Sequence, residues 1–248
     1  MRIYVILVFF VPVLSFAQLN LRDSAINQFF AGINYKFNMT AGDMSKRFGF
    51  NNEIGFDTQY KFKNNLTIGF DCGFIFGNQL KDSTIFDEVY NSYGTVTAMT
   101  GTPAVVLFLM RGAHGNFGAG YVFNKTGKNP NSGIWINGGF GYFMHKIRIE
   151  SIYDDVPQLE GDYRKGYDRL TMGIASKQFI GYLFQHNYRF LNFYAGFEFI
   201  EGLTWGVRNY QFDLGGPDSG LKFDFMYSVK LGWMIPIYKR QARSVYYD

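Results

Sequence analysis

This sequence has very little cysteine, no strong charge of one sign and, beyond its first residues, no long apolar run. A single cysteine, Cys72, occurs in 248 residues, so an internal disulfide is excluded and stability must come from packing and backbone pairing. After residue 17 the longest apolar run is Ala104 to Met110, far short of the roughly 20 residues that a membrane-spanning helix needs. A helical membrane protein is therefore excluded. The net charge of +4 is modest and scattered, which gives no reason to expect a nucleic-acid partner.

Aromatic residues, by contrast, are abundant. They make up 20% of the chain, with 28 Phe and 18 Tyr, and hydrophobic residues together reach 47%. The mean hydropathy is nevertheless only −0.10. Apolar and polar residues must therefore be finely interleaved along the chain.

The first residues have the order of a secretory signal peptide. A basic residue precedes an apolar stretch over 3–14, and Ser15-Phe16-Ala17-Gln18 offers small residues at the two positions that a signal peptidase reads. We expect residues 1–17 to be cleaved and 18–28 to form a periplasmic N-terminal segment. Because Gln18 rather than a cysteine would follow the cut, no lipoprotein is expected.

Beyond residue 28 the dominant pattern is a strict alternation of apolar and polar side chains. It is clearest over 221–238, where Phe223, Phe225 and Tyr227 alternate with Asp224 and Ser228. Segments of about ten residues with this period are typical of strands of a transmembrane barrel. The segments are 29–38, 53–62, 66–76, about 108–123, 134–149, 167–184, 188 to about 205 and 221–238. We therefore predict one all-β domain over 29–238, a transmembrane antiparallel up-and-down β-barrel of about eight strands, and a periplasmic tail over 239–248.

The chemistry of the two faces favours a membrane barrel over a soluble one. One face is dominated by Phe, Tyr, Ile and Leu, and the other by Gly, Asn, Lys, Asp and Glu. A soluble sandwich or lipocalin-like barrel, the alternative, would carry its polar residues outside. An even number of strands places both termini in the periplasm. The outer loops would then be about 39–52, 77–107, 151–166 and 206–220.

Two places depart from the simple pattern. His186-Asn187 is predicted to form a tight turn. Near His145 the apolar phase changes, because Ile147 and Ile149 occupy the other face. A β-bulge, or a strand that extends beyond the bilayer, would explain this change.

The inward positions collect ten charged side chains. An eight-strand lumen is only wide enough for side chains to fill, so we interpret the set as a salt-bridged polar plug, with a conducting pore as the alternative. The predicted lumen network comprises Lys36, Glu53, Asp57, Lys61, Asp71, Lys177, Glu198, Lys222, Asp224 and Lys230.

Catalytic and metal-binding patterns are weak. The three histidines, at 114, 145 and 186, lie on different predicted elements, and neither HExxH nor GxSxG occurs. His145 with Glu150, Asp154 and Asp155 is the one local match to the rim of a barrel enzyme. We interpret the histidines as satisfied polar or turn residues, and we expect no cofactor.

Charges also gather on two predicted surfaces. The acidic outer loop over 150–165 is interpreted as solvated, with a divalent-cation site as the alternative. The periplasmic side is basic, which suits inner-leaflet phosphates, an acidic partner or simple solubility. Its residues are Lys61, Lys63, Lys125, Lys128, Lys239, Arg240 and Arg243.

The longest outer loop, 77–107, combines acidic residues with aromatic and apolar ones. Exposed apolar residues on a loop either fold over the barrel mouth or meet another protein. The candidate partner-contact residues are Tyr90, Tyr93, Val105, Val106, Leu107 and Phe108.

Several segments give the chain a resemblance to the small outer-membrane β-barrel proteins of Bacteroidota. They are the junction over 15–18, Asn129-Pro130-Asn131-Ser132-Gly133 and Phe193-Tyr194-Ala195-Gly196-Phe197-Glu198-Phe199. Asp23-Ser24-Ala25 also resembles the O-glycosylation motif of that phylum. The chain departs from many such barrels by continuing ten residues past Tyr238 instead of stopping on a terminal aromatic. The resemblance implies location and fold rather than function.

These observations favour a non-enzymatic, integral barrel of the bacterial outer membrane. Its expected partners are the lipid bilayer, lipopolysaccharide and other outer-membrane proteins. The leading hypothesis is an accessory or structural subunit of a larger complex, such as protein-insertion or secretion machinery. A narrow porin-like channel and an outer-rim hydrolase acting on lipid A or peptides are the two alternatives.

Overall fold

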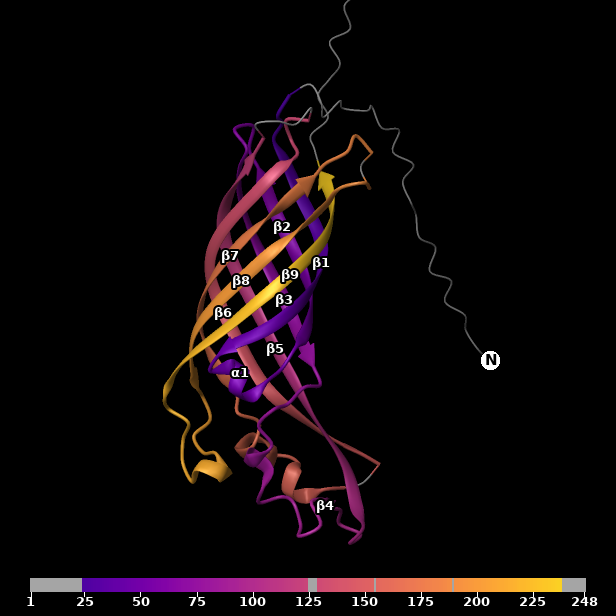
Figure 1. Ribbon diagram of the computed structural model, residues 1–248, viewed down its shortest axis with the longest axis vertical. Coiled ribbons are helices and arrows are strands. Elements are labelled where there is room, and N and C mark those ends of the chain that lie inside the picture. The colour runs from indigo at the N-terminus through magenta and orange to yellow at the C-terminus, as the bar shows by residue number, and fades with distance from the viewer. Residues whose placement is uncertain (1–23, 125–128, 154, 189, 238–248) are drawn as a thin grey trace, which may run out of the picture.

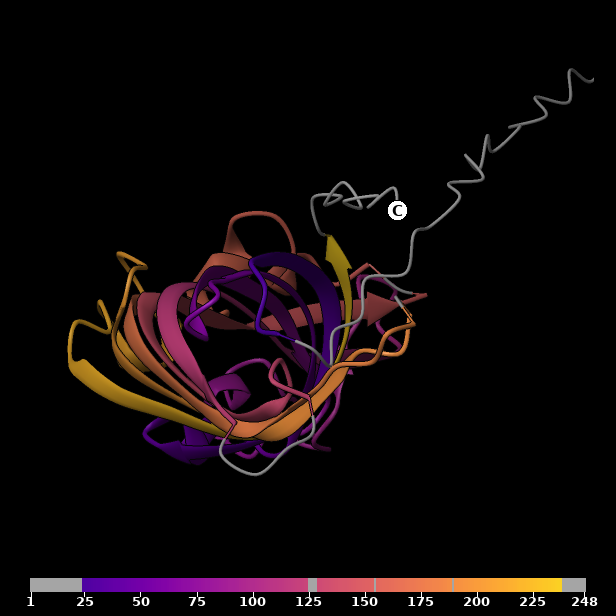
Figure 2. The ribbon, with the colours of Figure 1, turned by 90° about the horizontal axis from the view of Figure 1, so that it is seen from above.

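Eight long antiparallel strands close into a ring in the computed structural model, which describes residues 24–124, 129–153, 155–188 and 190–237. Each strand pairs with its neighbours in the chain, and the pairing of β1 with β9 closes the ring (Figures 1 and 2). The predicted fold is confirmed. The strands are β1 (Gln28–Gly42), β2 (Asn51–Lys61), β3 (Leu66–Gly77), β5 (Pro103–Phe123), β6 (Gly133–Ile152), β7 (Thr171–Phe184), β8 (Phe193–Gly206) and β9 (Leu221–Ile237).

Short elements occupy the loops at one end of the barrel. They are the helix α1 (Met44–Arg47), the two-residue strand β4 (Val96–Thr97) and the 3-10 helices η1 (Thr84–Phe86), η2 (Pro157–Leu159), η3 (Tyr163–Gly166) and η4 (Phe212–Leu214). Among the described residues, none of the helices combines the length and the apolar character needed to cross a bilayer.

The register of the ladders fixes the tilt of the strands. We followed the paired residues once around the ring, starting at Phe30 of β1. The path returns to β1 at Thr40, ten residues further along. Such an offset allows the sheet to close and tilts its strands by roughly 35–45° against the barrel axis. The residues on this path are Phe30, Gln59, Gly69, Gly118, Gly139, Lys177, Ile200, Met226 and Thr40.

The alternation in the sequence becomes the two faces of the wall. On β8, Phe197 is 58% exposed whereas its neighbour Glu198 is fully buried. The same order holds along β1, where Ile33 is 57% exposed and Lys36 is 1% exposed. The barrel is therefore apolar outside and charged inside, as the sequence predicts, and the half-buried Cys72 lies on the outward face of β3.

Some strand boundaries were wrong. β5 begins at Pro103 rather than near 108, β7 at Thr171 rather than 167, and β8 at Phe193 rather than 188. The tight turn predicted at His186-Asn187 is instead a longer connection between β7 and β8. Alternation alone does not fix where a strand begins, because apolar residues of an adjoining turn, such as Tyr167 and Leu191, can extend its pattern.

No β-bulge causes the phase change near His145. The pairs between β5 and β6 run without interruption from Phe123↔Ile134 to Val105↔Ile152, so the strands extend past the rest of the ring. Ile147 and Ile149 continue the inward face because the interior itself becomes apolar at that end.

The two ends of the barrel chain lie side by side, because Phe29 of β1 pairs with Ile237 of β9. They are at the end of the barrel opposite the loops that carry α1 and β4 (Figure 1). The expected signal peptide over 1–17, most of the N-terminal segment and the tail over 239–248 lie outside the described residues. So do Lys125, Lys128 and the basic residues predicted in the tail.

Candidate functional site

A compact ionic cluster fills the middle of the lumen. The Lys36 ammonium of β1 lies 2.7 Å from Glu53 Oε1 of β2 and also pairs with Glu198 of β8. Lys230 of β9 lies 2.9 Å from Glu198 Oε2 and 3.0 Å from Asp57 Oδ1. Two lysines thus share one glutamate across three neighbouring strands of the ring.

Neutral and aromatic groups complete the shell of Asp57. Its Oδ2 accepts a hydrogen bond from the Tyr194 hydroxyl and another, at 2.6 Å, from Asn34 Nδ2. Lys177 of β7 pairs with Asp71 of β3 across the lumen. Each carboxylate of the cluster therefore faces a cation.

His114 joins the cluster from β5. Its Nε2 lies 2.7 Å from Glu53 Oε1 and 3.2 Å from Lys36 Nζ, and its Nδ1 lies 2.7 Å from Asn116 Nδ2. The predicted site set lacked His114, Asn34 and Tyr194, although the alternation places all three on the inward face. The predicted set contained only Lys, Asp and Glu, so it left out these other hydrogen-bonding side chains.

The cluster is stable only as a whole. Four carboxylates, three lysines and one histidine are held almost entirely away from solvent. Removing charges from water costs several kcal/mol per ion, and close pairing offsets that cost only when the geometry is good. The interior of an eight-strand ring supplies this geometry, because it forces opposite walls to within side-chain reach.

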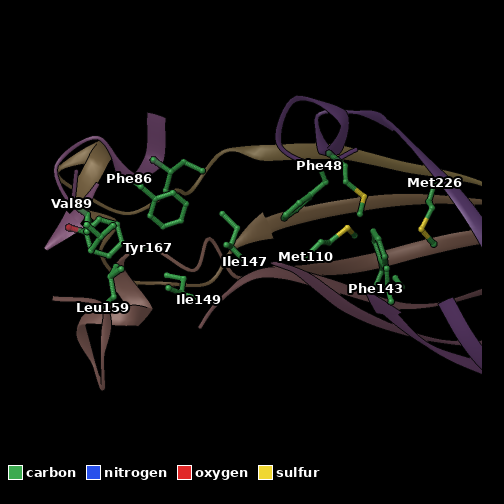
Figure 3. Close-up of a cluster of buried hydrophobic side chains, with 14 of the residues drawn as sticks. Phe48, Phe86, Val89, Met110, Phe143, Ile147, Ile149, Leu159, Tyr167 and Met226 are labelled. Atoms are coloured by element: carbon green, nitrogen blue, oxygen red, sulfur yellow. The ribbon is translucent and has the colours of Figure 1, made fainter. Parts of the chain in front are cut away.

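Apolar layers lie on both sides of the cluster. The layer toward the terminal end contains Phe30, Val122, Trp135, Phe179, Leu183, Tyr194 and Met234. The layer toward the loops includes Ile75, Met110, Phe143, Ala175, Ile200 and Met226 and continues through Ile147 and Ile149 into the loop residues Phe86, Val89, Leu159 and Tyr167 (Figure 3). Packed apolar side chains thus occupy the lumen on either side of the ionic cluster, which fits the plug interpretation.

Three predicted lumen residues lie outside this cluster. Lys61 is buried at the terminal end, where its ammonium contacts Asn131 Oδ1 at 3.0 Å, so it does not add to a basic periplasmic surface. Asp224 is buried near the loop end with His145 and Thr204. Lys222 is only half-buried and reaches Asp218 at the mouth. The alternation gives the face of each residue but not its depth.

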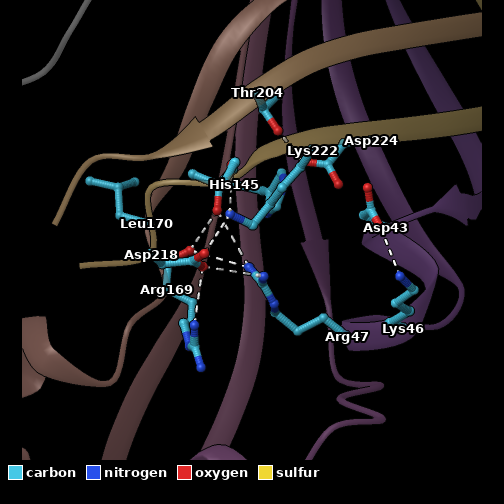
Figure 4. A network of polar contacts seen from close by, with 12 residues as sticks. Asp43, Lys46, Arg47, His145, Arg169, Leu170, Thr204, Asp218, Lys222 and Asp224 are labelled. Carbon is cyan, nitrogen blue, oxygen red and sulfur yellow. Dashed lines mark hydrogen bonds and ion pairs between the residues drawn. The ribbon is translucent and has the colours of Figure 1, made fainter. Parts of the chain in front are cut away.

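A second polar network lies at the mouth of the barrel (Figure 4). The Asp218 carboxylate is 2.8 Å from Lys222, 3.1 Å from Arg169 and 4.0 Å from Arg47, and these groups line a cavity of about 380 Å³. Arg169 also pairs with Asp213 and has a left-handed backbone with φ 48°. The network fastens the 207–220 loop to α1 and to the start of β7.

Burial alone would raise the pKa of Asp218. Lys222, Arg169 and Arg47 more than offset that effect and hold the pKa below its ordinary value. The ionised carboxylate is therefore the form that holds the loop.

The candidate catalytic grouping at the rim is not formed. His145 is buried and its Nε2 lies 2.8 Å from Asp224 Oδ2 (Figure 4). Glu150 pairs instead with Arg148. The Thr204 hydroxyl donates to the same Asp224 oxygen instead of to His145, so the histidine is not placed to take its proton. Asp154 lies outside the described residues.

Other predicted surface features have mixed outcomes. The described residues contain no group of three or more His, Cys, Asp or Glu side chains placed to hold a metal. Asp162 of the acidic loop pairs with Lys165 at 2.6 Å. Ser24, in the predicted glycosylation motif, is exposed.

The predicted partner-contact residues divide between two faces. Val105 to Phe108 belong to β5 rather than to a loop. Phe108 is inward and stacks on Phe86 with ring centroids 3.8 Å apart, and Val106 and Tyr90 pack against the same core. Tyr93, Val105 and Leu107 remain outside, at 89%, 54% and 39% exposure.

The comparisons with known proteins return structures only. No protein-family model and no curated protein matches this chain. The attachment invasion locus protein Ail of Yersinia pestis has a TM-score of 0.47 at 10% identity, over 85% of this chain and 99% of that one. Neisserial surface protein A has a TM-score of 0.45 at 10% identity, over 84% of this chain and 96% of that one. The N-terminal β-barrel domain of Pseudomonas aeruginosa OprF has a TM-score of 0.37 at 10% identity, over 84% of this chain and 99% of that one. Likenesses of this size carry no functional argument, and the Bacteroidota part of the resemblance stays a prediction.

Lys230→Met is predicted to destabilise the barrel by about 3 to 5 kcal/mol, because it leaves Asp57 and Glu198 buried with too little positive charge. Urea unfolding of the protein in lipid vesicles, followed by tryptophan fluorescence, measures this loss. Lys222→Met is the matched control and should cost at most about 1 kcal/mol, because Asp218 keeps Arg169. Equal losses for the two variants would refute the central role of the buried cluster.

The mouth network is predicted to open in acid. Because the folded pKa of Asp218 lies below the unfolded value of about 3.9, its stabilising contribution is complete above about pH 4 and is lost as the pH falls through the folded value. Hydrogen-exchange protection factors for residues 207–220 should fall in that window. Asp218→Asn should show low protection at every pH, and a pH-independent wild-type loop would contradict the assignment.

Proposed function

We propose that this protein is a non-enzymatic, integral barrel of the bacterial outer membrane that acts through its surfaces, as an accessory or structural subunit of a larger outer-membrane assembly. The observation that carries the proposal is the combination of an apolar exterior with a lumen closed by packed side chains. The assemblies that we propose are protein-insertion or secretion machines.

The exterior supports insertion into a bilayer. Phe140 is 77%, Phe117 66% and Ile174 61% exposed, which a water-facing wall would not favour. The strands are 11 to 21 residues long, enough for the 9 to 11 that a tilted spanning strand needs. The ring also pairs the backbone of every strand without leaving an edge in lipid. We assign the loop end to the outside, in contact with lipopolysaccharide, and both termini to the periplasm.

The lumen argues against transport. The ionic cluster and the apolar layers beside it fill the lumen with buried side chains that are packed or paired with one another. A narrow channel is therefore the weaker candidate, and single-channel recording of the purified protein in planar bilayers should show no steady conductance.

Catalysis at the rim is likewise disfavoured. His145 and Thr204 are buried and both bind Asp224, so substrate has no access to them. What the fold presents to other molecules is its outer wall and its loops, where Tyr93, Met99 and Tyr153 are 89%, 78% and 97% exposed. We therefore infer that the protein acts by binding other molecules through its outer wall and its loops.

Purification in mild detergent under native conditions, followed by mass spectrometry, tests the subunit role. A stoichiometric outer-membrane partner should accompany the full chain. Recovery of the barrel alone at native expression level would remove the main support for this role.

Ile33→Arg tests the membrane orientation. Ile33 lies midway along β1 with its side chain outward, so an arginine there should cost about 2 to 4 kcal/mol in a bilayer. Phe50→Arg changes an equally exposed residue, between α1 and β2 at the loop end, and should cost at most about 1 kcal/mol. The difference is measured by urea unfolding in vesicles. If the two variants behave alike, the wall does not face lipid.

A further inference from the structure

Three polar side chains lie together on the outer wall, among apolar residues. Ser176 and Gln178 project outward from β7, and the exposed Glu201 projects from β8. Ser176 lies directly opposite Glu201 in the ladder, and Gln178 Nε2 donates to Ser176 Oγ. The three side chains thus form one continuous polar patch.

The patch lies inside the apolar band, not beyond it. Along β8 the outward neighbours of Glu201 are Phe199 and Phe197 toward the terminal end, and Leu203 and Trp205 toward the loops. Phe199 is half-buried, and the other three are between 40% and 58% exposed. Across the ladder Glu201 pairs with Phe225 of β9. A carboxylate in this position faces lipid when the barrel is inserted.

The wall is hollowed beside the carboxylate. A cavity of about 480 Å³ opens on the outer surface over β6 to β9, with Ser176 and Glu201 as its polar groups. Its apolar walls are formed by Phe140, Ile174, Leu203, Phe223 and Phe225. Aromatic and aliphatic walls with one acid at the edge suit a long side chain that ends in a cation.

Glu201 has no partner of its own. Among the described residues no hydrogen bond or ion pair reaches it, whereas the outward Arg148 pairs with Glu150, and the outward Arg111 donates to the Met110 carbonyl. An unpaired ionisable residue within a membrane span is costly, and such residues mark functional contacts.

We propose that this groove binds a membrane-embedded segment of a partner protein and that a Lys or Arg of that segment pairs with Glu201. The inference rests on the proposed subunit function and assigns its contact face to β7, β8 and β9. Charge complementarity favours a cationic protein side chain over lipid A, whose phosphates would place like charge beside the carboxylate. The stem of the cation fills the apolar cavity while Ser176 accepts a further hydrogen bond from it.

The test is photo-cross-linking in cells that make the full chain with p-benzoylphenylalanine at Leu203. The expected product is a discrete protein adduct whose cross-linked peptide comes from a membrane-spanning segment that contains Lys or Arg. Glu201→Lys should abolish this product, and replacing the partner's basic residue by Glu should restore it. Glu201→Gln should give a partial loss.

Asn52→Lys is the matched control, since it places a lysine on the outward face of β2 near the same end of the barrel. It should leave the adduct unchanged, and heat-dependent gel migration verifies that each variant is folded. The proposal is overturned by an adduct with lipopolysaccharide, by an adduct with a second copy of this chain, by no adduct, or by one that Glu201→Lys leaves intact.

Native purification of Glu201→Lys separates the two hypotheses. If the partner found with the wild-type chain still copurifies with the variant, the groove assignment fails and the subunit role stands. If no partner copurifies with the wild type, the subunit role itself fails.

Discussion

The pairing of β1 with β9 is the constraint on which the rest of the molecule depends. These strands are the first and the last, and their ladder runs from Phe29↔Ile237 to Gly42↔Asp224. Without it the sheet would have two open edges, which a bilayer does not tolerate because their backbone groups would lack partners. With it, the ten-residue offset of the ring sets the tilt and hence a narrow interior.

A narrow interior explains why so many charges are buried together. Lys36, Glu53, Glu198 and Lys230 come from four adjacent strands, whereas Lys177 and Asp71 meet across the lumen. Each charge is stable only beside an opposite one, so the cluster resists stepwise change and favours a single arrangement of the walls. The apolar layers above and below exclude water from it and strengthen its electrostatic interactions.

The same wall has two different surfaces outside. Most of it is apolar, and lipid accepts such a surface without specificity. The patch of Ser176, Gln178 and Glu201 is different, because polar groups that face lipid are better satisfied by a protein partner with complementary groups than by lipid tails. The mouth network around Asp218 has a structural role of another kind, since it holds a long loop against the barrel so that the exposed loop residues keep fixed positions.

The period-two pattern by itself determined the strands, their inward and outward faces and the closed antiparallel fold, because a side chain's face depends only on its place along a strand. It placed His114 and Tyr194 on the inward face but did not say which residues they would meet. The tertiary structure decided depth and partners: that Lys61 lies far from the ionic cluster, that Asp224 rather than Glu150 faces His145, and that Val106 and Phe108 point inward. Those outcomes depend on the register of eight ladders around the ring, and register is a property of pairs of strands that no single segment of sequence contains.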